Sequence, residues 1–398
     1  MMDPLDFLAV DDLLSQEERD IRDTVRAFAQ AELAPHVADW YDQGTLPDDL
    51  APQLGKLGLL GMHLDGYGCA GLSAVAYGVA CRELEAVDSG LRSFVSVQGS
   101  LAMFAIHHWG SEEQKDEWLP RMAAGEALGC FGLTEPEAGS DPGSMRTRAR
   151  LDPSTGSGQA GEWVLNGNKM WITNGTLADV AVVWARVDGS GAEDGIRGFV
   201  VPTDTPGFTA TKIGRKLSLR ASVTAELSLD DVRLPASAAF PEVRGLKGPL
   251  TCLNEARFGI LWGAVGAARA CYQEALSYTG ERHQFGKPLA SFQLTQKKLA
   301  DMVIAVNNAS LVALQIGRLK DAGTLSPAQV SYGKYANVRA AVDVARSART
   351  LLGGAGITLE HSVMRHMNNL ETVLTYEGTE EMHVLSIGQA VTGIPAFR

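Results

Sequence analysis

Apolar residues recur at helical spacing through the first third of the chain. Ser15 and Glu18 have the spacing of a helix-capping box, and apolar side chains then recur every three or four positions as far as Pro35. Later stretches of this third have a similar character. We therefore predict an N-terminal α-helical domain over residues 1–130.

Near residue 130 the pattern changes to that of β-strands. Residues 180–187 are rich in β-branched side chains, and Asn166-Gly167-Asn168 is typical of a hairpin turn between two short strands. The Ser- and Gly-rich run 154–161 indicates a flexible connection. These features predict a middle antiparallel β domain over residues 131–240.

Helical patterns return from about residue 248. They span about 250–278, 292–322, 326–353 and 378–392. Long helices with short connections predict a C-terminal four-helix-bundle domain over residues 241–398. Because helices, strands and helices follow one another in blocks, the pattern predicts an α+β multidomain fold and argues against a doubly wound parallel sheet.

Composition narrows the classes of function. The chain of 398 residues has 35 basic and 47 acidic side chains, a net charge of −12, and 45% hydrophobic residues. The acidic balance argues against a nucleic-acid partner, and no stretch has the roughly 18 uninterrupted apolar residues of a membrane span. We expect neither partner.

The cysteines and histidines suggest neither a disulfide framework nor a metal site. The five cysteines are odd in number and form no C-x-x-C pair, and no histidines form H-E-x-x-H. We expect no metal and reduced thiols in a cytosol-like compartment. No signal or transit pattern is visible, so we expect a cytoplasmic protein.

Five segments carry candidate chemistry. They are 133–141, 171–175, 281–288, 353–356 and 375–379. Taken singly, each has a plain structural interpretation: a capped loop, a structural tryptophan, an interhelical turn, a helix stop and a surface glutamate.

The glutamate of the last segment has a second interpretation. Glu377 follows apolar Val373, Leu374 and Tyr376. In an apolar pocket its pKa would rise above about 4.3, which suits a general base at neutral pH. The local sequence does not decide between the two.

Taken together and in this order, the segments resemble the acyl-CoA dehydrogenase family over nearly the whole chain. Leu133-Thr134-Glu135-Pro136 with Gly139-Ser140-Asp141 is similar to the first flavin motif of that family, and Trp171-Ile172-Thr173-Asn174 to the second. The remaining motifs match Arg282-x-x-Phe285-Gly286 with Gln293, Gly353-Gly354, and Tyr376-Glu377-Gly378-Thr379.

The resemblance implies FAD as the cofactor. The contacts it implies are Phe131, Leu133, Thr134, Gly139, Ser140, Trp171, Ile172, Thr173, Arg282, Gln284, Phe285, Gln293, Gly353, Gly354, Thr379 and Glu381. Of these, Arg282, Gln284, Phe285 and Gln293 would reach the FAD of a neighbouring subunit. The resemblance therefore implies an oligomer, and the family is usually a homotetramer.

The resemblance also implies an acyl-CoA substrate with Glu377 as the base that removes its α-proton. Leu253, Asn254 and Arg257 match acyl-CoA contacts, and Ser140 would lie near the pantetheine. The backbone N–H of Glu377 and the flavin ribitol would stabilise the resulting enolate. The β-hydrogen would leave as hydride to the flavin, whose electrons would pass to electron-transfer flavoprotein.

Residues 83–98 are similar to the substrate-pocket helix of glutaryl-CoA dehydrogenases. The distinguishing residue is Arg92, whose guanidinium can hold a distal carboxylate bidentately. The substrate contacts implied beside it are Glu85, Ser93, Ser96, Tyr376 and Gly378. From spacing alone, a structural salt bridge from Arg92 to Glu85 or Asp88 is the competing interpretation.

This similarity implies oxidative decarboxylation of glutaryl-CoA to crotonyl-CoA and CO2, in lysine and tryptophan breakdown. Two alternatives stay open. One is a non-decarboxylating dehydrogenase of glutaryl-CoA or short-chain acyl-CoA. The other is a catalytically silent acyl-CoA-binding protein on the same scaffold.

Overall fold

The N-terminal part of the protein is helical. The computed structural model describes residues 3–153, 161–187, 189 and 195–396, so the predicted connection at 154–161 lies, up to residue 160, outside the described residues. The helices are η1 (Val10–Leu13), α1 (Gln16–Phe28), η2 (Ala29–Leu33), α2 (Val37–Gln43), α3 (Leu50–Lys56), α4 (Ala74–Val87), α5 (Ser89–Ser96), η3 (Val97–Met103), α6 (Phe104–Trp109) and α7 (Glu112–Ala123). Ser15 and Glu18 form the predicted capping box at the start of α1.

A β-sheet follows, with a short 3₁₀ turn, η4 (Pro142–Ser144), before its second strand. Its strands are β1 (Gly129–Gly132), β2 (Arg148–Asp152), β3 (Glu162–Thr173), β4 (Val180–Val187), β5 (Ile196–Pro202), β6 (Phe208–Lys212) and β7 (Thr224–Pro235). The order is β1-β4-β2-β3-β7-β6, with β5 paired to β4. The predicted β domain is present, but β1 and β2 run parallel to β4, so the sheet is mixed rather than purely antiparallel.

The predicted hairpin at Asn166-Gly167-Asn168 is wrong. β3 runs through these residues as one strand, with an irregular register against β7 between Leu165 and Gly167. Gly167 has a φ of 148°, and a Cβ there would lie 2.5 Å from Thr147 Oγ1. The glycine therefore allows a β-bulge, at which the strand bends but does not reverse direction.

The C-terminal part is a helical bundle. After η5 (Ala236–Ala238) it comprises α8 (Lys247–Glu281), a hairpin of β8 (His283–Gln284) and β9 (Lys287–Pro288), η6 (Leu289–Ser291), α9 (Gln293–Asp321), α10 (Pro327–Leu352), η7 (Ala355–Ile357), α11 (Val363–Thr375) and α12 (Glu380–Thr392). α10 packs on α8, α9, α11 and α12. The four predicted helices are found with small shifts, whereas α11 was not predicted.

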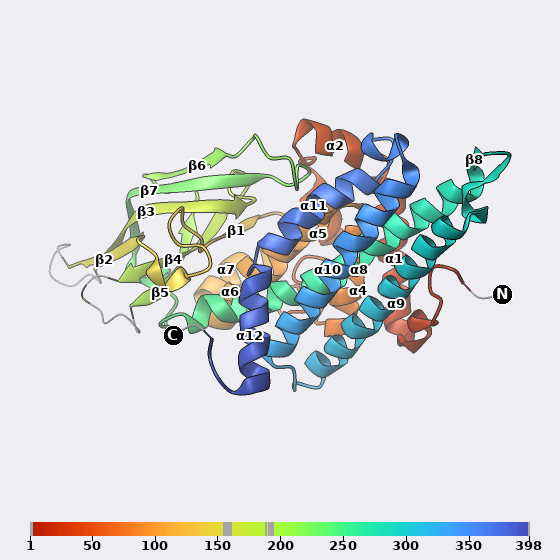
Figure 1. Cartoon of the computed structure of the whole chain (residues 1–398). Coiled ribbons are helices and arrows are strands. Elements are labelled where there is room, and N and C mark those ends of the chain that lie inside the picture. The colour runs from red at the N-terminus through yellow and green to blue at the C-terminus, as the bar shows by residue number, and fades with distance from the viewer. Residues whose placement is uncertain (1–2, 154–160, 188, 190–194, 397–398) are drawn as a thin grey trace.

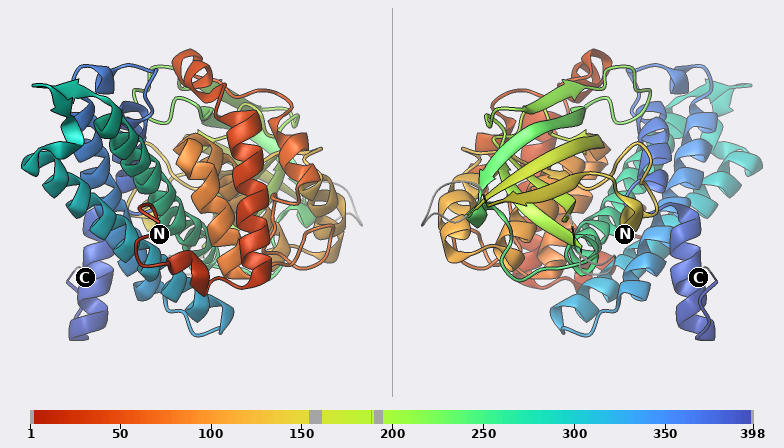
Figure 2. Two further views of the ribbon diagram at one scale, coloured as in Figure 1. Left: turned by 90° about the vertical axis from the view of Figure 1, so that its right-hand side faces the viewer. Right: turned by 90° about the vertical axis from the view of Figure 1, so that its left-hand side faces the viewer.

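The three parts form one body in which the helical parts lie side by side and the sheet stands at one end (Figures 1 and 2). α4 packs directly along α8. A Cβ on Gly263 would lie 2.0 Å from Glu85 Oε2, and one on Gly266 would lie 1.9 Å from the Arg82 carbonyl oxygen. These α8 glycines therefore serve close helix packing.

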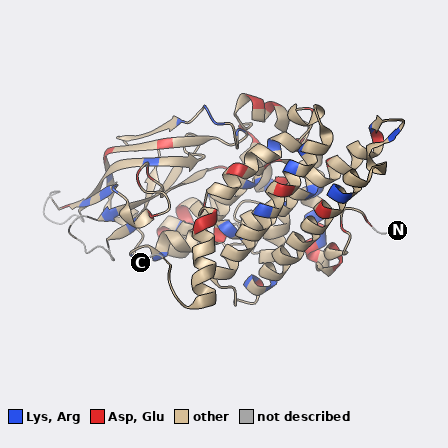
Figure 3. Cartoon of the chain, in the orientation of Figure 1, with Lys and Arg blue, Asp and Glu red and all other residues tan. Residues whose placement is uncertain are grey.

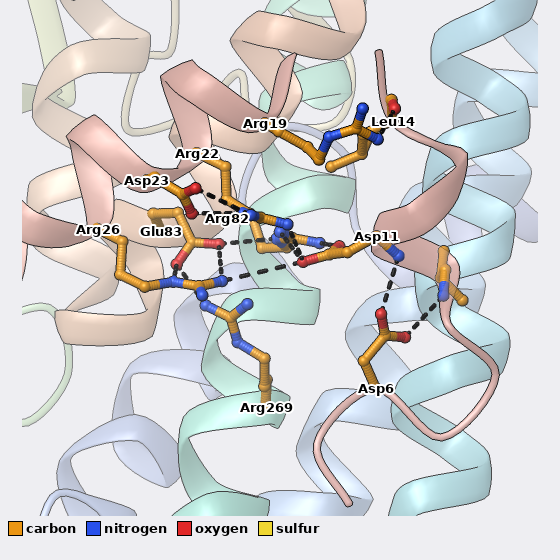
Figure 4. A network of polar contacts seen from close by, with 11 residues as sticks. Asp6, Asp11, Leu14, Arg19, Arg22, Asp23, Arg26, Arg82, Glu83 and Arg269 are labelled. Atoms are coloured by element: carbon orange, nitrogen blue, oxygen red, sulfur yellow. Dashed lines mark hydrogen bonds and ion pairs between the residues drawn. The ribbon is translucent and has the colours of Figure 1, made fainter. Parts of the chain in front are cut away.

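A buried ionic network joins the N-terminal segment to both helical parts (Figure 4). Glu83 on α4 accepts hydrogen bonds from Arg26 of α1, Arg82 of α4 and Arg269 of α8. Arg82 also donates to Asp11 at 2.6 and 3.1 Å. Burial alone would raise the pKa of Glu83, but the surrounding arginines hold that pKa well below its usual range.

Charged residues of both signs are interspersed over the helices and the sheet in Figure 3. One helix is apolar enough to test the expectation of no membrane span. By length and composition alone, α9 is long and apolar enough to cross a membrane. Because 44% of an apolar 18-residue stretch of α9 is buried inside the protein, a core helix explains the same composition. The absence of a span stays a prediction.

Candidate active site

Glu377 lies in the turn between α11 and α12. Figure 1 shows where these two helices meet, on the side of the bundle toward the sheet. The backbone of Glu377 is left-handed, with a φ of 53°, and Gly378 has a φ of 99°. Two cations hold the carbonyls of this turn. Arg257 Nε donates to the Glu377 oxygen at 2.7 Å, while Lys334 Nζ donates to the oxygens of Tyr376 and Gly378 at 2.5 and 2.6 Å.

The Glu377 side chain is not a solvated surface carboxylate. Its Oε2 atom is buried and has no hydrogen-bond partner among the described residues. Burial raises the pKa of Glu377 to about 7, although the charges of Arg92, Arg257 and Lys334 act in the opposite direction. A carboxyl group with this pKa can accept and return a proton at neutral pH, as a general base must.

Lys334 is a site residue that the sequence interpretation missed. It lies on α10 and is only 1% exposed. Burial lowers its pKa to about 7, an effect that the nearby Glu377 carboxyl opposes. The available signal was its position: Lys334 shares one buried helix face with Val330, Val338 and Ala341, where an unpaired lysine would be costly.

Arg92 links a buried ion pair to the turn of the base. Its Nε donates to Glu85 Oε2 at 2.6 Å, and its Nη2 donates to the hydroxyl of Tyr376, the residue before Glu377. Ser89 also donates to Glu85, at 2.8 Å. The salt-bridge interpretation therefore holds for Glu85, and the contact with Tyr376 places Arg92 at the site as well.

Asp88, the other candidate partner of Arg92, is occupied elsewhere. It accepts hydrogen bonds from Arg365 at 2.5 Å and Asn369 at 2.9 Å, both on α11. Ser93 and Ser96 are buried on the same helix as Arg92, and the Ser96 hydroxyl has no partner among the described residues.

Two of the three predicted acyl-CoA contacts on α8 are joined to the base. Arg257 Nη1 donates to Asn254 Oδ1 at 3.2 Å, while Arg257 Nε holds the Glu377 carbonyl. Leu253 is half-buried beside them on the same helix. Asn254, Arg257 and Glu377 therefore form one hydrogen-bonded chain.

The two predicted flavin motifs of the sheet come together. Thr134 accepts a hydrogen bond from the backbone N–H of Met170 at 2.8 Å. Buried Lys169 Nζ donates to the Leu133 carbonyl at 3.1 Å and to Glu135 at 2.8 Å. Because these bonds join the loop after β1 to β3, the sheet fixes one motif against the other.

Trp171 is not a core tryptophan. It is 57% exposed and has a φ of 64°, whereas Ile172 beside it is buried in the sheet. Gly139 and Ser140 are exposed, and none of the described atoms lies within 4 Å of a Cβ built on Gly139. The exposed ring of Trp171 and the open backbone at Gly139 each leave room for a planar cofactor. Phe131 is buried and Thr173 half-buried.

Four of the predicted FAD contacts are not brought to this site within one chain. Arg282, Gln284 and Phe285 lie on the β8–β9 hairpin, at the end of the bundle away from the sheet (Figure 1), and Gln293 begins α9. Phe285 is 93% exposed. This position fits the expectation that the hairpin serves a neighbouring subunit.

Four further predicted FAD contacts lie at helix ends. Gly353 and Gly354 end α10, and none of the described atoms lies within 4 Å of a Cβ built on either. Thr379 caps the start of α12, and Glu381 is exposed in its first turn. The roles of these four residues toward FAD stay predictions.

The chain belongs to the acyl-CoA dehydrogenase family. Family models match for the acyl-CoA dehydrogenase N-terminal domain over residues 15–126, the middle domain over 130–232 and the C-terminal domain over 243–392. The predicted family and fold class are confirmed, and the protein is an FAD-dependent oxidoreductase. The finer domain boundaries stay predictions.

The chain is similar to several characterised members. The structure of a glutaryl-CoA dehydrogenase from Mycobacterium smegmatis in complex with FADH2 is 62% identical, with a TM-score of 0.96 and full coverage of both chains. Butyryl-CoA dehydrogenase from Megasphaera elsdenii is 33% identical, with a TM-score of 0.89 over 95% of this chain and 98% of that one. The mitochondrial short-chain specific acyl-CoA dehydrogenase of Rattus norvegicus is 36% identical over 94% of this chain and 90% of its own.

Proposed function

We propose that this protein oxidises and decarboxylates glutaryl-CoA, with Glu377 as the base and Arg92 as the ligand of the distal carboxylate. The observation that carries the proposal is the hydrogen bond from Arg92 to Tyr376, which links a buried guanidinium to the residue before the base. The 62% identity to a glutaryl-CoA dehydrogenase supports the same substrate.

The charges around the base fit an anionic acyl group. Arg92, Arg257 and Lys334 are set against the carboxylates Glu85 and Glu377, so the cations outnumber the carboxylates. A substrate carboxylate would compensate the remaining positive charge and accept charge-assisted hydrogen bonds from Arg92. A straight-chain acyl group would supply neither.

The chain's own residues account for the proton steps. Glu377 removes the α-proton, and its backbone N–H, which donates to no other group of the described residues, stabilises the enolate oxygen. Bound FAD supplies the acceptor for the hydride that leaves the β-carbon. The product at this stage is glutaconyl-CoA.

In the proposed reaction, Glu377 also serves the step in which CO2 is lost. The electrons of the breaking bond to the γ-carboxylate flow into the conjugated thioester and give a dienolate. The protonated Glu377 returns its proton to that dienolate, which yields crotonyl-CoA. A pKa near 7 suits both directions of this proton transfer.

The wider setting is part of the proposal. We propose electron-transfer flavoprotein as the electron acceptor, a homotetramer as the assembly, the cytoplasm as the location, and lysine and tryptophan breakdown as the pathway. Family membership and the exposed β8–β9 hairpin support the assembly. Gel filtration with light scattering would test it, and a monomer that retains FAD would contradict it.

Product analysis tests the proposed reaction. Glutaryl-CoA is mixed anaerobically with the FAD-loaded protein, and CO2 and acyl-CoA products are measured over one turnover. We expect crotonyl-CoA and CO2 in equal amounts. Glutaconyl-CoA without CO2 would instead identify a non-decarboxylating dehydrogenase, and failure of every acyl-CoA to reduce the flavin would favour a catalytically silent binding protein.

A further inference from the structure

One buried ammonium group holds both neighbours of the proposed base. Lys334 projects from α10, and its Nζ donates to the carbonyl oxygens of Tyr376 and Gly378, on either side of Glu377. The carbonyl of Glu377 itself is bonded to Arg257. Two cations from two different helices thus hold three successive carbonyls.

The turn needs such support because its backbone is unfavourable. Glu377 has a Cβ atom and yet a φ of 53°, in the left-handed region that such residues rarely adopt. A side chain at Gly378 would be strained as well, since its φ is 99° and a Cβ there would lie 3.0 Å from His383 Nε2. Lys334 fixes the peptide that precedes Glu377 through the Tyr376 carbonyl, and Arg257 fixes the peptide that follows it through the Glu377 carbonyl. The bond from Lys334 to the Gly378 carbonyl holds the next peptide of the turn.

Lys334 also contributes to the charge at the base. The groups that face Glu377 come from every helix around it. They are Arg92 of α5 with its partner Glu85 of α4, Arg257 of α8, Lys334 of α10, Tyr376 of the turn itself, and His383 and Glu380 of α12. Burial holds His383 neutral, with its pKa lowered to about 3.

The charged groups around Glu377 differ in whether an oppositely charged partner compensates them. Arg92 is paired with Glu85, and its charge still lowers the pKa of Glu377. Glu380 is paired with Arg339. Lys334 and Arg257 bond only neutral groups among the described residues, so both charges act on Glu377 without a carboxylate partner of their own. Because a nearby cation favours the ionised carboxylate, Lys334 opposes the effect of burial on Glu377.

We propose that Lys334 is a positioning residue for the base: its two hydrogen bonds hold the carbonyls on either side of Glu377, and the charge of its protonated form favours the ionised carboxylate. This inference rests on the proposed role of Glu377.

The test compares three substitutions at Lys334 with a control on the same helix. Lys334→Met removes the donors and the charge, Lys334→Gln keeps a donor without charge, and Lys334→Arg keeps the charge. The control is Asn337→Leu. Asn337 is equally buried and also donates to two backbone carbonyls, those of Leu261 and Ala309, at 3.0 Å each, but it carries no charge.

The measurement is the second-order rate constant of anaerobic flavin reduction by glutaryl-CoA as a function of pH, which reports the pKa of the base in the free enzyme. The acidic limb of the wild type should lie near pH 7, the pKa of Glu377. Lys334→Met should move this limb upward by about one pH unit or more, because the carboxyl loses a nearby cation.

The other variants separate charge from hydrogen bonding. Lys334→Gln should show a similar upward shift with a smaller loss of the limiting rate at high pH, and Lys334→Arg should return the limb toward the wild-type position. Asn337→Leu should lower the melting temperature and leave the limb in place. If Lys334→Met does not hold FAD, Lys334→Gln carries the same test.

Two results would overturn the inference: an acidic limb at the wild-type position in an FAD-loaded Lys334→Met or Lys334→Gln, or an equal shift in Asn337→Leu. Glu377→Gln, measured in parallel, keeps this failure distinct from that of the proposed function. Persistent flavin reduction in Glu377→Gln would contradict the assignment of Glu377 as the base. If Glu377→Gln is inactive but the acidic limb does not move in the lysine variants, only the role of Lys334 is contradicted.

Discussion

Replacement of Arg92 by methionine should change substrate choice more than it changes catalysis in general. In the structure, Arg92 donates to Glu85 and to the Tyr376 hydroxyl, and it does not bond the base directly. Methionine keeps much of the side-chain volume but removes the guanidinium. We expect glutaryl-CoA, which carries a distal carboxylate, to lose far more activity than butyryl-CoA, which lacks one.

The size of this effect follows from the bonds that are lost. A hydrogen bond to a charged group contributes about 1.5–3 kcal/mol, which corresponds to a factor of roughly 10 to 200 in kcat/KM. We therefore expect the ratio of kcat/KM for glutaryl-CoA to that for butyryl-CoA to fall by this factor. A ratio is the appropriate quantity because general damage to the site lowers both values alike.

Stability should fall as well, by a separate mechanism. Without Arg92, the fully buried Glu85 carboxylate retains, among the residues that the structure describes, only the hydrogen bond from Ser89. An uncompensated buried charge costs about 3–5 kcal/mol. The double variant Arg92→Met/Glu85→Gln removes both charges, so it should recover much of the lost thermal stability while the selectivity ratio stays low.

The assay is steady-state reduction of an artificial electron acceptor with both substrates, on variants whose FAD content has been matched. Equal losses of kcat/KM on glutaryl-CoA and butyryl-CoA would refute the reasoning and return Arg92 to a purely structural role. Recovery of selectivity in the double variant would refute it too, because no guanidinium is restored there.

Two further predictions concern sites away from the base. Glu83→Gln should lower the melting temperature strongly, by the equivalent of about 3–5 kcal/mol, because buried Arg82 and its neighbours Arg26 and Arg269 lose their shared carboxylate. Glu371→Gln, which breaks an exposed pair with Arg346, should change the melting temperature little. Equal shifts would contradict the network's role. Arg282→Met should lower FAD retention on gel filtration without lowering the stability of the apoprotein, since Arg282 is exposed; full retention would contradict its assignment to FAD.

The sequence predicts the order of helical and β parts because each part has a strong hydrophobic period. The capping box at Ser15 and Glu18 and the helix start at Ser326 are local signals, and local signals determine these features. The predicted hairpin was wrong because its local signal is ambiguous. Asn-Gly favours positive φ, and both a turn and a bulge use it, so only the register against β7 distinguishes them.

α11 escaped prediction because polar side chains share its buried face with Val363, Leu370 and Val373 and interrupt the apolar repeat. Arg365, His366 and Asn369 are buried there, and Arg365 and Asn369 bond Asp88 at the start of α5. A hydrophobic period cannot reveal a helix whose burial is stabilised by hydrogen bonds to distant residues. The partner of each group is known only once the chain is folded.

The candidate site likewise combines features that the local sequence reveals with features that depend on the folded chain. The motif around Glu377 is contiguous and could be recognised, whereas its raised pKa depends on burial by separate helices. Lys334 lies 43 positions from Glu377 and belongs to no motif. Only the folded chain brings its Nζ to the carbonyls of Tyr376 and Gly378. Contacts between subunits lie outside a single chain altogether.

The most direct test of the central claim is anaerobic bleaching of the bound flavin by glutaryl-CoA in the wild type and in Glu377→Gln. The account predicts rapid bleaching with release of CO2 in the wild type, and a variant that keeps its yellow FAD and binds the substrate but does not bleach. Bleaching of Glu377→Gln at a rate near that of the wild type would contradict the assignment of Glu377 as the base.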